Sequence, residues 1–152
     1  VMHHMWRVAT LARGRRAYRS VAIVGSGPAG FYCAKELLRT DPTMRVDMYE
    51  RLCVPYGLLR YGVAPDHPEV KNASLTCEKV GDDPRVRWIG NVHIGKDLPV
   101  SVLRALYFAV VFTYGADEDR MLGVPGEHLR GIWGAREFVE WYNGMPGSQE
   151  RD

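Results

Sequence analysis

Three regularly spaced glycines are the first residues of this sequence whose spacing could serve chemistry. Gly25, Gly27 and Gly30 lie in the segment Gly-Ser-Gly-Pro-Ala-Gly, and the acidic residue Glu50 follows 20 residues after Gly30. At this spacing the first glycine permits a tight turn, the second lets the backbone approach a pyrophosphate, and the third lets a helix pack closely on a strand. The pattern predicts a loop, called the glycine loop below, that holds the phosphates of a dinucleotide.

The residues around the three glycines narrow the choice of ligand. Pro28 and Ala29 complete the glycine loop at the start of a predicted helix, whose N–H groups and positive dipole end favour phosphate. The carboxylate of Glu50 could accept hydrogen bonds from ribose hydroxyls and would repel a 2′-phosphate, which disfavours NADP at this site. The residues alone leave NAD or the ADP half of FAD, with a chance glycine turn before a helix as the alternative without function.

The elements around the glycine loop form a predicted β-α-β unit. The apolar run 21–24 predicts a buried parallel strand, residues 31–39 show the apolar spacing of a helix, and residues 45–50 predict a second strand. Pro42 should keep the helix from continuing. The sequence therefore predicts an α/β fold, namely a Rossmann-like domain with a parallel sheet.

The rest of the chain carries weaker signals for secondary structure. Residues 51–68 have no clear period and predict an ordered loop, and residues 117–134 predict a hairpin or an extended loop. Ser101 is the predicted N-cap of a short helix. The remaining predicted elements are helices over 69–80, 101–107 and 135–142 and strands over 86–89, 92–94 and 108–113.

Composition and charge exclude several classes of protein. The 152 residues carry a net charge of +2, and the first 20 contain five arginines and no acid, so residues 21–152 have a net charge of −3. This body lacks the basic face that nucleic-acid recognition requires. No run of about 18 apolar residues predicts a membrane span. Three cysteines without a Cys-x-x-Cys pair argue against a disulfide reductase, and the histidines lack the spacing of metal ligands, so no metal is expected.

Residues 1–20 form an Arg-rich leader that we interpret as a mitochondrial transit peptide. Met5, Trp6, Val8 and Leu11 supply the apolar residues of such a peptide, and acids are absent. A basic unstructured terminus or translated upstream sequence is the alternative. The predicted division is therefore a leader over 1–20 and part of a dinucleotide-binding domain over 21–152.

A long segment after the second predicted strand carries a specific resemblance. Residues 55–72, Pro-Tyr-Gly-Leu-Leu-Arg-Tyr-Gly-Val-Ala-Pro-Asp-His-Pro-Glu-Val-Lys-Asn, resemble almost residue for residue the corresponding segment of the adrenodoxin reductases, which are mitochondrial NADPH–ferredoxin reductases with bacterial relatives. The small subunit of glutamate synthase is similar in its glycine loop but poorer over this segment. The other matching stretches are 21–30, 90–92, 114–116, 124–127 and 138–144.

The resemblance implies a set of cofactors, partners and site residues. It implies FAD at the glycine loop, NADPH in a second Rossmann domain, and a [2Fe–2S] ferredoxin (adrenodoxin) as electron acceptor. Ala29 would lie against the FAD pyrophosphate, Glu50 against the adenosine ribose, and Leu58 and Ile94 at further FAD contacts. His67 would lie near the flavin ring as the candidate catalytic residue, with a loop histidine held by backbone hydrogen bonds as the alternative.

The family pattern also continues beyond residue 152, into a second glycine-rich loop that has no counterpart in this sequence. We therefore expect a truncated part, or an incomplete gene model, of an FAD-dependent NADPH:ferredoxin oxidoreductase of the mitochondrial matrix, with peripheral attachment to the inner membrane left open. The chain alone should bind FAD weakly or not at all and should not oxidise NADPH. A non-catalytic FAD-binding or interaction module, or an NAD-dependent dehydrogenase, are the alternatives.

Overall fold

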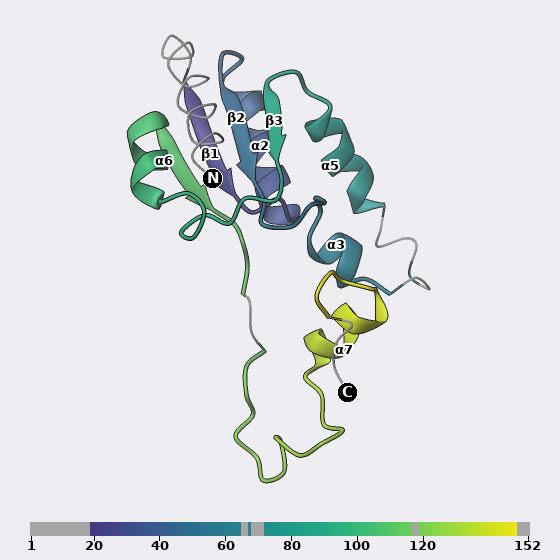
Figure 1. The fold of residues 1–152 in the computed structure, drawn as a ribbon. Coiled ribbons are helices and arrows are strands. Elements are labelled where there is room, and N and C mark those ends of the chain that lie inside the picture. The colour runs from purple at the N-terminus through teal and green to yellow at the C-terminus, as the bar shows by residue number, and fades with distance from the viewer. Residues whose placement is uncertain (1–18, 65–66, 68–71, 117–118, 149–152) are drawn as a thin grey trace.

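The computed structural model describes residues 19–64, 67, 72–116 and 119–148, and these contain one four-stranded parallel sheet (Figure 1). The strands lie in the order β3-β2-β1-β4. Val21 of β1 pairs with Val46 on one side and with Ala109 on the other. The strands are β1 (Ser20–Val24), β2 (Arg45–Tyr49), β3 (Val86–Ile89) and β4 (Ala109–Phe112). The predicted α/β fold with a parallel sheet is thereby confirmed.

Helices connect the strands and cover both faces of the sheet. Helix α2 leads from β1 to β2, α5 lies between β2 and β3, and α6 precedes β4. In Figure 1, α2 and α5 lie on one side of the sheet, and α6 lies apart from them beside β1. The helices are α2 (Pro28–Thr40), α3 (Leu58–Tyr61), α5 (Ala73–Gly81), α6 (Val100–Leu106) and α7 (Ala135–Tyr142).

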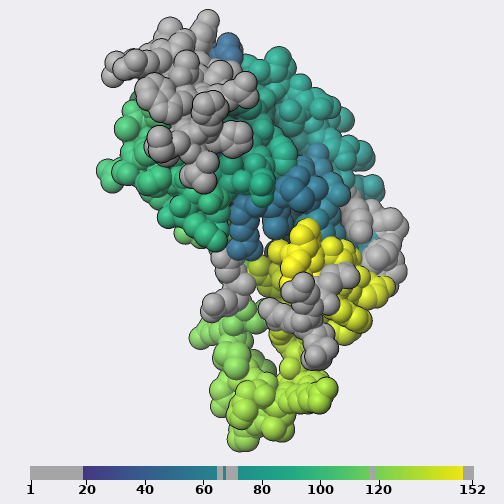
Figure 2. All heavy atoms as spheres, in the orientation of Figure 1, coloured from purple at the N-terminus to yellow at the C-terminus, as the bar shows by residue number. Residues whose placement is uncertain are grey.

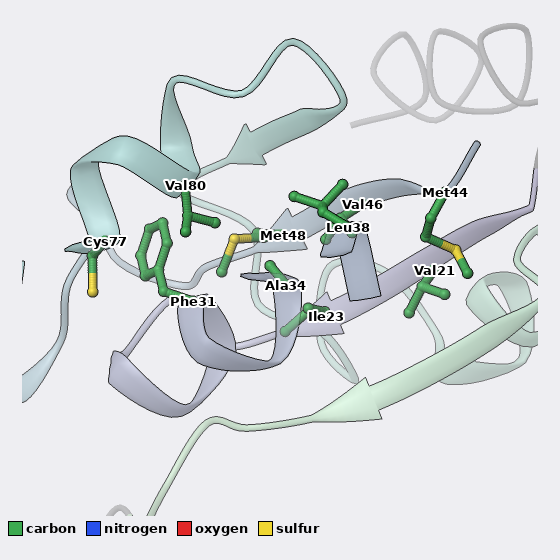
Figure 3. Packing of buried hydrophobic residues seen from close by; sticks show 10 residues of the cluster. All are labelled: Val21, Ile23, Phe31, Ala34, Leu38, Met44, Val46, Met48, Cys77 and Val80. Atoms are coloured by element: carbon green, nitrogen blue, oxygen red, sulfur yellow. The ribbon is translucent and has the colours of Figure 1, made fainter. Parts of the chain in front are cut away.

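Two apolar clusters, one on each face, explain why β1 is almost continuously apolar. Side chains alternate along a strand, so neighbouring residues point to opposite faces. Ala22, Val24 and Tyr49 accordingly pack with Leu103 of α6. Buried on both sides, such strands need no polar face. The larger cluster, between the sheet and helices α2 and α5, contains Val21, Ile23, Phe31, Ala34, Leu38, Met44, Val46, Met48, Cys77 and Val80 (Figure 3).

Several predicted boundaries are wrong for local reasons. Helix α2 begins at Pro28 rather than at 31, because proline is suited to the first helical position. Helix α6 begins at Val100, and its N-cap residue is Pro99, which has no side chain that could cap it. The prediction of Ser101 as the N-cap is therefore wrong, because Ser101 lies inside the helix. Residues 92–94 form no strand; Ile94 makes only an isolated bridge with Leu98. The expected loop 51–68 contains the short helix α3.

The C-terminal part of the described chain forms an arm that leaves the sheet and returns. After β4 the chain runs away from the sheet, and α7 comes back beside α3 (Figure 1). The Asn143 side chain donates a hydrogen bond to the Tyr61 carbonyl at 2.9 Å and ties this arm to the body. Described residues 119–134 contain turns and no strand, so the extended loop is confirmed and the hairpin is not, while α7 matches its predicted range. No described helix is both long and apolar enough to pass through a bilayer.

Candidate nucleotide-binding site

A cleft of about 620 Å³ lies where the C-terminal ends of β1, β2 and β4 meet the N-terminus of α2. The glycine loop, the end of β2 and helix α3 form its near walls, and residues 112–116 and α7 form the far side. Figure 2 shows an opening between the sheet side of the molecule and the yellow segment around α7. In parallel sheets, ligands bind at this edge where the connections of neighbouring strands lie on opposite faces. Here α2 follows β1 on one face, and α6 precedes the neighbouring strand β4 on the other.

Gly25 and Gly30 are glycines because the backbone leaves no space for a side chain. Gly25 has a φ of +105°, and a Cβ there would lie 2.6 Å from the Tyr114 Cα. A Cβ on Gly30 would lie 2.3 Å from the Gly25 carbonyl oxygen. These contacts correspond to the tight turn and the close helix packing that the spacing predicts.

Gly27 differs, because it faces open space. A Cβ on Gly27 would meet nothing within 4 Å, and the residue lines the cleft together with Pro28 and Ala29. Gly27 is also the N-cap of α2, which has no side-chain capping bond and no acid in its first turn. The uncapped N–H groups of a helix start and the positive end of its dipole suit an anion such as a pyrophosphate.

Glu50 lies directly after β2, is 8% exposed, and lines the same cleft. Its Oε2 accepts hydrogen bonds from the Ser26 N–H at 2.9 Å and the Ser26 hydroxyl at 2.7 Å. Its Oε1 accepts from the Leu52 N–H at 3.1 Å. A buried carboxylate held by three donors is fixed in position, and Oε1 keeps the capacity to accept a further hydrogen bond.

A second polar network supports β2 behind the cleft. The buried Asp47 carboxylate accepts from Arg87 at 2.6 and 3.0 Å and from the Tyr107 hydroxyl at 2.6 Å. The Tyr107 and Tyr49 hydroxyls lie 2.8 Å apart, and Tyr49 lines the cleft. Burial, followed by the charge of Asp47, raises the pKa of Tyr107 far above its ordinary value, so this hydroxyl stays a donor.

The predicted site residues are only partly brought together. Gly25, Gly27, Pro28, Ala29, Glu50, Leu58 and Ile94 all line the cleft. Gly30 acts behind it by packing, and His67 does not line it. His67 is exposed, and its N–H donates to the Ala64 carbonyl at 3.1 Å. The predicted leader covers residues 1–20, of which residues 1–18 lie outside the described part of the chain. Its last residue, Ser20, begins strand β1.

Sequence reasoning missed the wall that α7 provides. Arg136 and Glu140 line the cleft and form an ion pair at 2.7 Å, and Arg136 also donates to the Ala116 carbonyl. Arg51, directly after Glu50, lines the cleft as well. Of these residues, only Arg51 carried a signal in the sequence, because it directly follows Glu50. In the part of the chain that the structure describes, no group of three or more His, Cys, Asp or Glu side chains could hold a metal.

Comparisons with known proteins agree with this geometry. No family model matches the chain. The chain is 53% identical over 130 residues to a protein of Salvelinus fontinalis and 55% identical over 126 residues to one of Arabidopsis thaliana, both named NADPH:adrenodoxin oxidoreductase, mitochondrial. These alignments cover 86% and 83% of this chain and 26% of each relative. The chain thus spans about a quarter of the length of these relatives.

Solved structures show the same relationship in three dimensions. The chain matches FprA from Mycobacterium tuberculosis in complex with NADPH with a TM-score of 0.83 and 46% identity. The match covers 88% of this chain and 30% of FprA, and a histidine-to-glutamine variant of FprA matches equally well. The resemblance is therefore confirmed: by sequence and by fold, this chain is related to the adrenodoxin reductase family, over about a quarter of the length of its members.

Proposed function

We propose that this chain is the FAD-binding part of an NADPH:ferredoxin oxidoreductase, in which electrons pass from NADPH through FAD to a [2Fe–2S] ferredoxin of the adrenodoxin type. The observation that carries the proposal is that three features line one cleft. They are the N-terminus of α2, which has no side-chain cap, Gly27 with open space beside its Cα, and the buried carboxylate of Glu50 at the position suited to a ribose. The names of the relatives, NADPH:adrenodoxin oxidoreductase, supply the reaction.

The residues of the cleft fit the ADP half of FAD. Gly27, open and at the helix start, would face the pyrophosphate with Ala29 beside it, and Glu50 would accept from the ribose. Leu58 and Ile94 add apolar surface. When bound, FAD would take a hydride from NADPH and release electrons one at a time. The chain itself would bind, orient and partly shield the cofactor.

NADPH is assigned to another part of the complete protein. The Glu50 carboxylate would repel a 2′-phosphate, so the cleft would discriminate against NADPH. No second Gly-x-Gly pattern occurs among the 152 residues. We therefore propose that NADPH reduces the flavin from a separate domain. The solved complex of FprA with NADPH supports this proposal, because about 70% of the FprA chain lies outside the part matched here.

His67 is proposed to lie beside the flavin in the complete protein. This assignment follows from the resemblance of residues 55–72, since His67 lies outside the cleft in this chain. A His67→Gln substitution should shift the pH profile of flavin reduction in the complete protein while leaving ADP affinity of the cleft unchanged. An unchanged pH profile would reject a proton-transfer role.

The proposed location is the mitochondrial matrix, with peripheral attachment to the inner membrane as a further possibility. The relatives carry the word mitochondrial in their names, and the Arg-rich leader suits import. Import of the chain into isolated mitochondria, with and without residues 1–20, tests the leader. Carbonate extraction of the imported protein then separates matrix from membrane-bound material.

Binding and turnover by the purified 152-residue chain test the proposed function. We expect weak binding of ADP and FAD at the cleft, seen as NMR shift changes of the glycine loop, and poorer binding of NADPH. We expect no NADPH-dependent reduction of ferredoxin or cytochrome c. Tighter binding of NADPH than of ADP would contradict the proposal, and so would robust turnover. A stable monomer that keeps FAD through gel filtration would instead support a non-catalytic FAD-binding module.

A further inference from the structure

We propose that Ser26 and Trp88 are positioning residues that set the specificity of the cleft for an unmodified adenosine ribose, by holding the Glu50 carboxylate in one orientation. The inference rests on the proposed function, because it assumes that a ribose meets Glu50. It concerns two consecutive hydrogen bonds that lead from Trp88 on the edge strand β3, through Ser26, to the carboxylate of Glu50. We call this series, Trp88–Ser26–Glu50, the relay.

The direction of each hydrogen bond in the relay is determined by chemistry. The Trp88 indole can only donate, and its Nε1 lies 3.3 Å from the Ser26 Oγ. The Ser26 hydroxyl therefore accepts from Trp88 and donates its proton to the Glu50 Oε2 at 2.7 Å. The Ser26 N–H donates to the same oxygen at 2.9 Å. Oε2 is fully used, so a ribose hydroxyl would have to bond to Oε1.

Burial makes the Ser26–Glu50 part of the relay rigid, whereas Trp88 itself is 37% exposed. Ser26 is 0% exposed, so its hydroxyl has no water to turn toward. Strand β3 places Trp88 opposite Met48, two residues before Glu50, through the parallel register of β2 and β3. Gly90 makes room for the indole, since a Cβ there would lie 2.1 Å from the Trp88 Cη2. A carboxylate held this way cannot rotate away from a 2′-phosphate, so the repulsion remains. It also cannot rotate toward another donor when the 2′-hydroxyl is absent, so the lost hydrogen bond is not replaced.

The alternative is that Ser26 and Trp88 only stabilise the fold by satisfying a buried charge. The two roles differ in how the affinity depends on the ribose. A positioning role predicts that variants lose affinity for a nucleotide with a 2′-hydroxyl and keep their affinity for one without it. A structural role predicts equal losses for both nucleotides, because a distorted cleft holds every ligand less well.

Nucleotide titrations of the 152-residue chain, followed by NMR, distinguish the two roles. The probes are ADP, 2′-deoxy-ADP and adenosine 2′,5′-bisphosphate. We expect the wild type to prefer ADP over 2′-deoxy-ADP by about tenfold, in line with the loss of one hydrogen bond to a charged group. Ser26→Ala, which keeps the backbone N–H bond, should reduce this preference to about threefold or less. Trp88→Phe removes the indole donor, and Gly90→Ala displaces the indole, so both should reduce the preference to the same extent. Ser101→Ala and Trp133→Phe, at two residues that do not line the cleft, are the matched controls and should keep the preference.

The indole N–H resonance of Trp88 provides a second readout that is independent of ligand. It should shift in Ser26→Ala, and also in Glu50→Gln if the relay is continuous. ADP binding with an unchanged ribose preference in all three variants would overturn the relay alone. Equal losses for ADP and 2′-deoxy-ADP would also overturn it. Failure of the wild type to bind any of the three nucleotides would overturn the proposed function and the relay with it.

Discussion

At the scale of single residues, the glycines of one loop are required for different reasons. Gly25 is excluded from carrying a side chain by its positive φ and by the Tyr114 backbone, whereas Gly27 has open space beside its Cα. The first glycine therefore serves the fold, and we propose that the second serves the ligand. Sequence alone cannot separate these roles, because the two residues belong to one motif.

A pair of alanine substitutions should separate the two glycines. Gly27→Ala should leave the unfolding free energy within about 0.5 kcal/mol of wild type but lower ADP affinity at least about tenfold, because the methyl group enters the cleft. Gly25→Ala should cost about 3 kcal/mol or prevent folding, through strain and a backbone clash. Urea denaturation and NMR titration measure both effects. Equal destabilisation by the two changes would contradict the assignment.

At the scale of elements, polar side chains lock the sheet to its helices at two points. One is the end of α2, where Arg85 donates to the Leu38 carbonyl at 3.1 Å and is itself held by Asp83. The other is the Asp47 network, which joins β2 and β3 to the residue that follows α6. Both link residues that lie 40 or more positions apart.

The Asp83–Arg85 pair should make stability depend on pH in the acid range. The hydrogen bond from Arg85 lowers the pKa of Asp83 below its ordinary value of about 3.8. The folded protein binds this proton less readily than the unfolded chain does, so the pair stabilises above the unfolded pKa and loses its effect as pH falls through the folded pKa. The stability gap between wild type and Asp83→Asn should therefore persist from pH 7 to 5 and narrow below about pH 4. Denaturant titrations across this range measure the gap, and a gap that widens on acidification would refute the argument.

Removing one hydroxyl tests the second contact between elements. Tyr107→Phe deletes the donor to Asp47 but leaves the bonds from Arg87 in place. We expect a loss of about 1–2 kcal/mol in unfolding free energy, typical of a bond to a charged group. Tyr32→Phe, on an exposed tyrosine of α2, is the control and should have almost no effect. A loss of similar size in both variants would show that the bond from Tyr107 to Asp47 does not add to the unfolding free energy.

At the scale of the whole molecule, the arm after β4 exposes much apolar surface. Leu122 is 80% exposed, and Leu129 and Ile132 are about 60% exposed. Helix α7 contains no buried residue, although Phe138 and Trp141 pack on each other. Large exposed apolar side chains gathered on one segment favour association. The part matched here makes up only 26% of the first relative, so such a relative has further chain that could cover this surface.

This surface leads to a prediction for the isolated 152-residue chain. It should associate with rising concentration, and a triple change of Leu122, Leu129 and Ile132 to lysine should suppress the association. The nucleotide cleft should be unaffected, because none of the three residues lines it. Sedimentation velocity and ADP titration measure the two properties. A monomeric wild type at high concentration would argue against an apolar contact through the arm.

Local patterns alone determined the parallel α/β fold, the glycine loop and helix α7. These features depend on residues close together in sequence, such as the apolar run of β1 and the spacing of Gly25, Gly27 and Gly30, so a single sequence reveals them. The same locality explains the errors at residues 92–94 and at Ser101, where Pro99 and the path of the chain outweigh a short apolar or polar signal.

Only the tertiary structure decided which distant residues meet at the cleft. Trp88 reaches Ser26 across 62 positions because β3 pairs with β2, and Arg136 reaches the cleft because the arm folds back. No local period encodes such meetings, since they follow from strand order, register and the return of a long loop. The structure also placed His67 outside the cleft, although Leu58 and Tyr61 of the same segment, residues 55–72, line it. The physical reason is that contacts between distant residues depend on the packing of the whole chain.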